Sequence, residues 1–505
     1  MASSLTKGAA GNTGGKTFFG HPRGLATLFM TEMWERFSFY GMRALLVVYL
    51  ISGGPDAGSG SQGGGLAMDL ATATAIYSVY NAMVYLLALP GGWFGDRVWG
   101  PRKTVAIAAG IIMCGHLALA VPGQAMFFVG LALVATGSGL LKANISTMVG
   151  HLYNGPDDPR RDGGFTVFYM SINLGAFIAP FVIGTVGQTV NWHLGFSLAA
   201  VGMALGLVQF LLGSRNLDPR SSTVPVPLSA QERTAVVRKG LIWLAVAVVF
   251  YAVVVGTGHF TLNWAMIPLT LLGLLLPAGM LLRIKRDKDL TATEQGRMTG
   301  YIWFFVAAAV FWMIFDQGAS TVQAFGDGKT STSILGWNFP STWFQSINPL
   351  FIILIAPLFA ALWLALNRRG KEPSTTVKFS FALVVIGLSF FVFTIPMSMA
   401  TGDTKVSPLW LVLIFLMHTI AELCLSPVGL SVTTKLAPAK YASQLMGVWF
   451  LAVTAGDCVT GMLAIGGADL SGTGVVALEA ALAVVAGCAV FMYRKKITEN
   501  MSEVK

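Results

Sequence analysis

Charged residues are scarce in this sequence. Asp, Glu, Lys and Arg make up 11% of the 505 residues, while 54% are hydrophobic. A soluble core of this size needs a more charged surface, so the composition excludes a soluble globular protein. Cysteine and histidine are also rare. Because the six histidines are scattered and the four cysteines lie inside apolar segments, we expect neither a metal site nor a disulfide framework.

The N-terminal region lacks the apolar core of a cleavable signal peptide. Residues 1–23 are polar and Gly-rich. We therefore expect a short cytoplasmic tail there, followed by a first helix that itself directs insertion into the membrane.

Long apolar stretches are abundant. Windows of about 20 apolar residues, each long enough to cross a bilayer, recur along the whole chain. They predict an all-α integral membrane protein with about 14 transmembrane helices. The expected helices lie near 24–51, 70–95, 104–121, 125–150, 163–187, 194–213, 240–257, 261–282, 297–323, 342–366, 378–399, 408–436, 442–467 and 473–493.

The positive charges follow these helices. If the N-terminus is cytoplasmic, 28 of the 33 Lys and Arg residues fall in cytoplasmic loops and tails, and Lys329 and Lys405 fall outside. This bias predicts that both termini are cytoplasmic. The net charge of +10 is then a matter of topology and does not indicate a nucleic-acid surface.

The middle of the chain divides it into two halves. A Pro-rich stretch and a charged loop flank two plain apolar helices at 240–282, with six helices before this block and six after it. Such a layout is expected of two bundles that rock about a central site. We expect a tail (1–23), an N-terminal bundle (24–213), linkers with a peripheral helix pair (214–296), a C-terminal bundle (297–493) and a second tail (494–505).

The first helix carries an unusual stripe, EMWERFSFYGMR, at positions 32–43. Glu32 and Arg36 are four residues apart and can pair, and Glu35 and Arg43 lie nearby. Each charge near mid-bilayer costs roughly 2.5–3.5 kcal/mol. The stripe must therefore face a wet cavity between helices, or else form a buried ion-pair network.

Five further ionisable residues lie inside predicted helices: Lys142, Asp316, Glu422, Asp457 and Glu479. At about 1.5 Å of rise per residue, Arg43 and Asp316 fall at a similar depth toward the outer side. Lys142 lies toward the cytoplasm and Glu422 near the middle of its helix, which suggests an inner pair. Asp457 and Glu479 have no obvious partner, and we expect structural roles for both.

Several motifs resemble known transporters. GGWFGDRVWGPRKTV (91–105) resembles the loop between helices 2 and 3 of the major facilitator superfamily. The stripe resembles the Glu-x-x-Glu-Arg-Phe element of the proton-dependent oligopeptide transporter family, bacterial type. Five more segments match that family in order: GLLKANISTMVG (139–150), FYMSINLGAF (168–177), FWMIFDQGA (311–319), QSINPLF (345–351) and ELCLSPVGLSVTTKLAP (422–438).

The resemblance implies a role for each matching position. Glu32, Glu35, Arg36 and Asp316 would couple protons. Arg43 with Asp316 would form an outer gate, and Lys142 with Glu422 an inner one. The substrate site would comprise Arg36, Tyr40, Arg43, Tyr80, Lys142, Asn173, Trp312, Asn348, Glu422 and Trp449.

Three positions depart from the family pattern. Phe39 stands where a second Tyr is usual, which removes one polar contact. Ser78 replaces a histidine found in animal relatives, and Asp316 replaces the Glu of many relatives.

The residue chemistry agrees with this resemblance. A zwitterion needs an acidic and a basic pole, Arg can grip a carboxylate with two hydrogen bonds, and aromatic walls accept varied side chains. Alternatives remain for single positions. Asn173 and Asn348 could instead bond between helices, and Tyr80, Trp312 and Trp449 could be ordinary packing residues.

The sequence thus predicts a proton-coupled symporter that imports di- and tripeptides by alternating access. The proton gradient would drive it without a cofactor, as a monomer in a bacterial inner membrane. The alternative is a transporter of another small solute, such as nitrate, an amino-acid derivative or a peptidomimetic drug. A membrane enzyme is disfavoured because no nucleophile–base or metal constellation is evident.

Overall fold

The computed structural model describes residues 17–57, 63–155, 158–334 and 336–501, most of which are helical. The elements are α1 (Arg23–Ile51), α2 (Leu70–Leu86), α3 (Ala88–Phe94), η1 (Gly95–Trp99), α4 (Pro101–Ala120), α5 (Gln124–His151), α6 (Arg161–Ala179), η2 (Pro180–Gly184), α7 (Thr185–Thr189), α8 (Trp192–Gly213), η3 (Ser214–Asn216), η4 (Pro219–Ser222), α9 (Ala230–Gly256), α10 (Asn263–Lys285), α11 (Ala292–Phe315), η5 (Asp316–Ala319), α12 (Thr321–Gly328), β1 (Ser333–Ile334), β2 (Trp337–Asn338), η6 (Ser341–Ser346), α13 (Ile347–Arg368), α14 (Thr375–Met399), α15 (Leu409–Leu436), η7 (Ala439–Tyr441), α16 (Ala442–Ile465), α17 (Thr473–Met492) and α18 (Arg494–Asn500).

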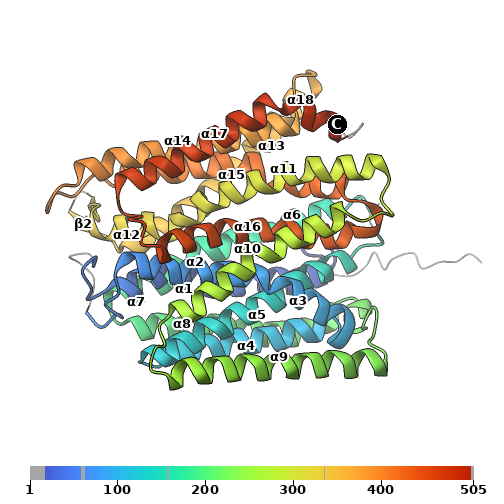
Figure 1. The fold of residues 1–505 in the computed structure, drawn as a ribbon, viewed down its shortest axis with the longest axis horizontal. Coiled ribbons are helices and arrows are strands. Elements are labelled where there is room, and N and C mark those ends of the chain that lie inside the picture. The colour runs from blue at the N-terminus through green and yellow to red at the C-terminus, as the bar shows by residue number, and fades with distance from the viewer. Residues whose placement is uncertain (1–16, 58–62, 156–157, 335, 502–505) are drawn as a thin grey trace, which may run out of the picture.

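The long helices run side by side (Figure 1). Thirteen helical segments are long and apolar enough to cross a membrane, and α1, which carries the ionisable stripe, is a further continuous helix of 29 residues. Helices suit the bilayer because they satisfy their backbone hydrogen bonds internally. The prediction of an all-α membrane protein with about 14 crossings is confirmed.

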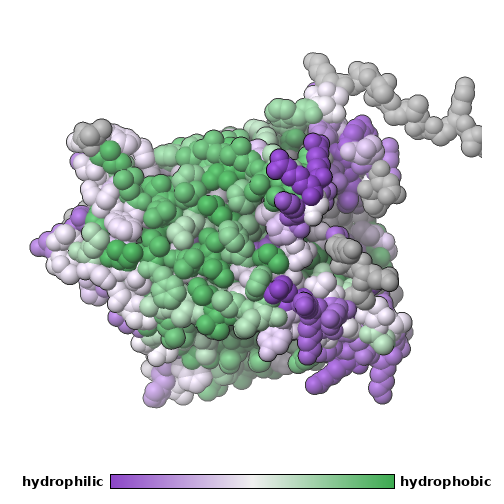
Figure 2. Space-filling model, turned by 90° about the horizontal axis from the view of Figure 1, so that it is seen from above, coloured by the Kyte–Doolittle hydropathy of each residue, from purple (hydrophilic) through white to green (hydrophobic). Residues whose placement is uncertain are grey.

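The two ends of the bundle differ. We call the end that carries α7, α12 and the β1–β2 hairpin the hairpin end, and the end that carries α18 the terminus end (Figure 1). Figure 2 shows a broad apolar face between polar ends, with the most hydrophilic residues gathered at the terminus end. The apolar face has the character of a surface in contact with lipid.

The inserted helix pair extends further than the sequence indicated. Helix α9 begins at Ala230 and not near 240, so the Pro-rich linker is shorter than expected. A capping box starts the helix, because Ser229 Oγ accepts from Glu232 N at 3.2 Å and Glu232 Oε2 accepts from Ser229 N at 2.9 Å. Such reciprocal caps satisfy the free N–H groups at the start of the helix.

The two inserted helices also differ in their packing. Helix α9 runs along one edge of the bundle and Val254 is its one buried residue, so it is peripheral as expected (Figure 1). Helix α10 instead packs against both α2 and α16. The expectation of a peripheral pair therefore does not describe α10.

The remaining long helices pack in two groups. One group comprises α1, α2, α4, α5, α6 and α8, and the other comprises α11, α13, α14, α15, α16 and α17. The two groups occupy mainly the lower and upper parts of Figure 1. The groups meet where α2 lies along α16 and α6 lies against α13. The boundaries at 213 and 297 stay predictions.

Helix α6 lies directly on α1 at Gly175. A Cβ at this position would lie 2.4 Å from Met33 O and 2.9 Å from Phe37 N. Only a residue without a side chain allows the two backbones to approach so closely. This contact holds α6 against the part of α1 that carries the ionisable stripe.

We expect Gly175→Ala to lower the apparent Tm of the detergent-solubilised protein by several degrees, since overpacking costs about 1–3 kcal/mol. The control is Gly110→Ala on α4, where a Cβ would meet nothing within 4 Å. The control should match or exceed the wild-type Tm because alanine favours helix over glycine. Equal Tm values for both variants would contradict the close packing of α6 on α1.

Candidate functional site

Glu32, Glu35 and Arg36 form a buried charge group on α1. Arg36 Nε lies 2.9 Å from Glu32 Oε1 and 2.6 Å from Glu35 Oε2, although its N–H is not aligned for a hydrogen bond to either oxygen. Ser138 Oγ on α5 donates to Glu35 Oε1 at 3.0 Å. Two carboxylates share one guanidinium, so the group is neutral only when it holds a proton.

Arg43 and Asp316 join the two groups of helices. Arg43 Nη2 donates to Asp316 Oδ1 at 2.7 Å, and Arg43 Nε donates to Tyr77 Oη on α2 at 2.8 Å. Asp316 lies where α11 passes into η5, so its carboxyl projects toward α1 at the hairpin-end side. The structure therefore brings the expected outer pair together and adds Tyr77, which the sequence did not indicate.

Lys142 and Glu422 are not paired in this structure, contrary to the expected inner pair. No ion pair joins them within the described parts of the chain. The Lys142 Nζ instead lies 3.5 Å from the centre of the Tyr85 ring, while Glu422 Oε2 accepts from Asn348 Nδ2 at 3.1 Å. Lys142 lies on α5 and Glu422 on α15, which belong to different groups of helices. In this structure, contacts between the two halves close the hairpin end instead.

Asn348 and Glu422, two of the expected substrate-site residues, lie together. Asn348 Nδ2 donates to Glu422 Oε2 and to Thr419 Oγ1, the latter at 3.0 Å. Asn173 Nδ2 instead donates to Tyr169 O of its own helix at 3.3 Å. In this conformation Glu422 and Asn348 thus form a unit that Asn173 does not join.

The expected aromatic residues differ in exposure. Tyr40 is half-buried, with the Arg43 guanidinium 5.7 Å from its ring centre. Tyr80 and Trp449 are each 5% exposed, and Trp449 packs edge-on against Phe379. Trp312 is half-buried and packs against Phe311 and Phe315. Tyr40 and Trp312 are therefore partly exposed here, while Tyr80 and Trp449 pack in the core.

A second polar contact between the halves lies at the hairpin end. Gln188 Nε2 on α7 donates to Asp327 Oδ1 and to Ser341 Oγ, each at 2.7 Å. Its Oε1 accepts from Thr342 N at 3.2 Å. All four residues are buried. We call this set the glutamine latch; no spacing in the sequence connects its members, so sequence reasoning missed it.

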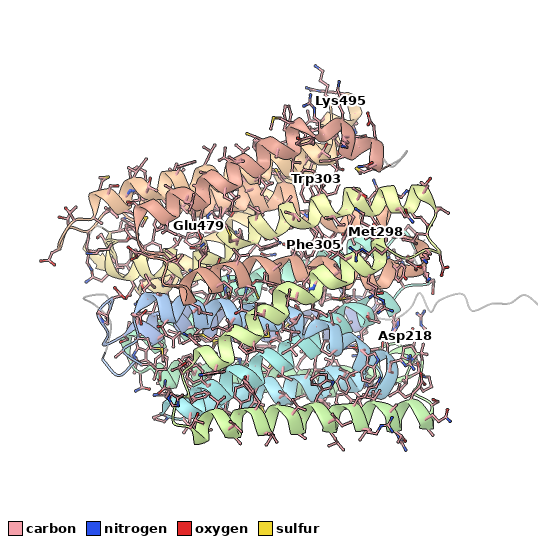
Figure 3. All side chains as sticks on the ribbon, in the orientation of Figure 1. Asp218, Met298, Trp303, Phe305, Glu479 and Lys495 are labelled. Atoms are coloured by element: carbon pink, nitrogen blue, oxygen red, sulfur yellow. The ribbon has the colours of Figure 1, made fainter. Side chains whose placement is uncertain are left out.

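Glu479 lies inside the C-terminal group of helices, away from the terminus end, where Lys495 and Asp218 are found (Figure 3). Gln317 Nε2 donates to its Oε1 at 3.1 Å and to its Oε2 at 3.0 Å. Both partners come from the same half, which agrees with a structural role. The sequence offered no obvious partner for Glu479, and the structure supplies Gln317, whose side chain is polar but not charged.

We expect Gln188→Ala to open the hairpin end more often. The substitution removes three hydrogen bonds between the halves, each contributing about 1 kcal/mol, so the open population should rise at least tenfold. Spin labels would be attached at Val190→Cys and Thr404→Cys in a background without the native cysteines. Pulsed electron paramagnetic resonance would then show the open state as a population with a longer distance between the two labels.

The control for this measurement is Thr189→Ala on the same helix. Thr189 Oγ1 donates only to Thr185 O, one turn back on α7. Its removal should leave the distance distribution unchanged. An equal change in both variants, or none in Gln188→Ala, would contradict the glutamine latch.

Comparison with known proteins places these features in context. A model of the POT family matches residues 102–466. An uncharacterized transporter of Bacillus subtilis (strain 168) is 46% identical over 89% of each chain. A di-/tripeptide transporter of Lactococcus lactis subsp. cremoris is 38% identical over 97% of this chain and 98% of that one. The crystal structure of a peptide transporter POT in complex with sulfate is similar, with a TM-score of 0.90, 42% identity, and coverage of 96% of this chain and 97% of that chain.

Proposed function

This chain belongs to the POT family of membrane transporters, and on that basis we propose that it is a proton-coupled symporter that imports di- and tripeptides by alternating access. The observation that carries the proposal is the Arg43–Asp316 ion pair, at 2.7 Å, between the two groups of helices. Protonation of Asp316 would abolish the attraction that holds these helices together.

The charges on the two sides suit a zwitterionic peptide. Arg36, Arg43 and Lys142 lie on α1 and α5, and Glu422 with Asn348 lies on α15 and α13. A peptide carboxylate would bind the basic side through charge-assisted hydrogen bonds. Its amino group would bind Glu422 and the amide oxygen of Asn348. The half-buried rings of Tyr40 and Trp312 would contact side chains without selecting one.

We propose the following coupling sequence. A proton from outside neutralises Asp316, Arg43 is released, and the peptide carboxylate takes the place of the Asp316 carboxylate beside Arg43. Formation of the Lys142–Glu422 pair would close the cytoplasmic side while the outer side is open, and its release would open that side. The formed Arg43–Asp316 pair and the unpaired Lys142 and Glu422 support the assignment of this structure to the state closed outside.

Energy would come from the proton gradient and no cofactor would be needed. Each proton entering down 100 mV contributes about 2.3 kcal/mol. The clustering of basic residues in the loops and tails at the terminus end supports cytoplasmic termini. The bacterial relatives support a bacterial inner membrane as the location. Each chain contains both groups of helices and the whole site, which supports function as a monomer.

We expect purified protein in proteoliposomes to accumulate labelled dialanine when an inward proton gradient is present. Unlabelled trialanine should compete and nitrate should not, because nitrate offers no amino group to Glu422. Accumulation that is independent of the gradient, or blocked by nitrate, would contradict the proposed function.

We expect Asp316→Asn to reduce gradient-driven accumulation at least tenfold, since an amide cannot take up the proton. Counterflow, in which labelled and unlabelled dialanine exchange without a gradient, should persist. Glu479→Gln is a matched control, because it removes a buried carboxyl of the same half whose hydrogen-bond donor, Gln317, also lies in that half. Normal accumulation by Asp316→Asn would refute the gate assignment.

A further inference from the structure

Asp457 is a buried carboxyl for which the coupling sequence above has no use. It lies on α16, where this helix runs along α2 of the other half, and it is 2% exposed. A carboxylate at this depth is costly without a cation or a proton. The group that donates a hydrogen bond to it, the side chain of Asn81, is a neutral amide.

Three contacts fix the position of Asp457. Asn81 Nδ2 on α2 donates to Asp457 Oδ2 at 2.8 Å. Thr460 Oγ1 donates to Met313 O on α11 at 3.2 Å. Gly456 lets the two backbones approach, because a Cβ there would lie 2.7 Å from Met313 N. Asp457 is thus held beside the last turn of α11.

Asp316 follows Met313 at the end of α11, so both carboxyls border the same seam between the halves. Arg43 donates to Asp316 Oδ1, whereas Asp316 Oδ2 is buried and has no hydrogen-bond partner among the residues that the structure describes. Asp316, Arg43 and Lys142 are the charged side chains within electrostatic range of Asp457.

The other surroundings of Asp457 supply no further balancing charge. On α2, Tyr77 accepts from Arg43 and lies within electrostatic range of Asp457. On α10, the groups beside this stretch are Gly273 and Thr270, neither of which ionises. Glu422 on α15 acts on the same cluster through Asp316 and carries the same sign. Lys142 is placed over Tyr85, and Cys458 is the one ionisable neighbour on α16 itself.

We propose that Asp457 is the second carboxyl of the outer gate, and that Asp316 and Asp457 together hold one proton while the gate is closed. Arg43 balances one carboxylate, and the proton balances the other. Mutual repulsion of two nearby carboxylates favours binding of that proton, which belongs to the pair and not to one residue. The inference rests on the proposed function, because it assigns Asp457 a share in proton coupling.

The test is the dependence of gradient-driven dialanine uptake on external pH. Asp457→Asn removes the second carboxylate but keeps an oxygen that can accept from Asn81. In the wild type the proton that the pair holds can pass to Asp316 and release Arg43. In Asp457→Asn no proton is shared in this way, so Asp316 must take one from outside while it faces Arg43, without the repulsion that raises the proton affinity of the pair. Release of the gate then needs a lower external pH. We expect the half-maximal pH to fall by about one unit, with counterflow exchange within about twofold of wild type.

Two further variants separate proton sharing from a merely structural contact. Thr454→Val removes another hydrogen bond across the same seam, from Thr454 Oγ1 to Ala82 O at 3.1 Å, without altering a carboxyl. Its half-maximal pH should equal that of the wild type. Asp457→Glu restores a carboxyl and should return the half-maximal pH toward the wild-type value.

An unchanged half-maximal pH in Asp457→Asn, or an equal shift in Thr454→Val, would overturn the inference while leaving the peptide symporter standing. Absence of dialanine counterflow in the wild type would instead overturn the proposed function, and this inference with it. If Asp457→Asn does not fold, Asp457→Ser, which also keeps an acceptor for Asn81, is judged by the same criteria.

Discussion

The structure depends on the cost of placing charge inside a membrane. A guanidinium or carboxylate that loses its partner there is far less stable than one in water, so every such group must remain compensated. Arg43 meets this requirement through Asp316 and Tyr77. Because these partners come from different helices, the requirement of a single side chain decides how α1, α2 and the end of α11 are arranged.

The same constraint connects closure to the solute. When the halves separate at the hairpin end, Arg43 and Asp316 lose each other and each must find another partner. In the proposed coupling sequence a proton neutralises the carboxyl, and the carboxylate of a zwitterion pairs with the guanidinium. Glu422, which accepts from Asn348 in the closed state, can receive the amino group. A solute with one charge of each sign therefore completes the balance that opening disturbs.

Much of this architecture could be predicted from the sequence. The apolar stretches predicted the crossings because hydropathy directly sets the spans, and the spacing of Glu32 and Arg36 predicted their pairing because helix geometry is local. Depth along a helix also predicted Arg43 with Asp316. Depth does not give the angle around the helix axis or the conformational state, so the same reasoning put Lys142 with Glu422, which lie apart here. Gln188 and Asp327 carried no signal because their contact depends on tertiary packing alone.

The helix pairs that pack along their length limit how the halves can move. Helix α2 lies along α16 and α6 against α13, and α10 contacts both α2 and α16. Rigid helices packed in this way can rotate about their contact line more easily than they can separate, because separation exposes close-packed surfaces. The ion pair and the glutamine latch lie toward the hairpin end, while Lys142 and Glu422 lie farther toward the terminus end. Rotation about these seams therefore brings one set of charges together as it draws the other apart, which is what alternating access requires.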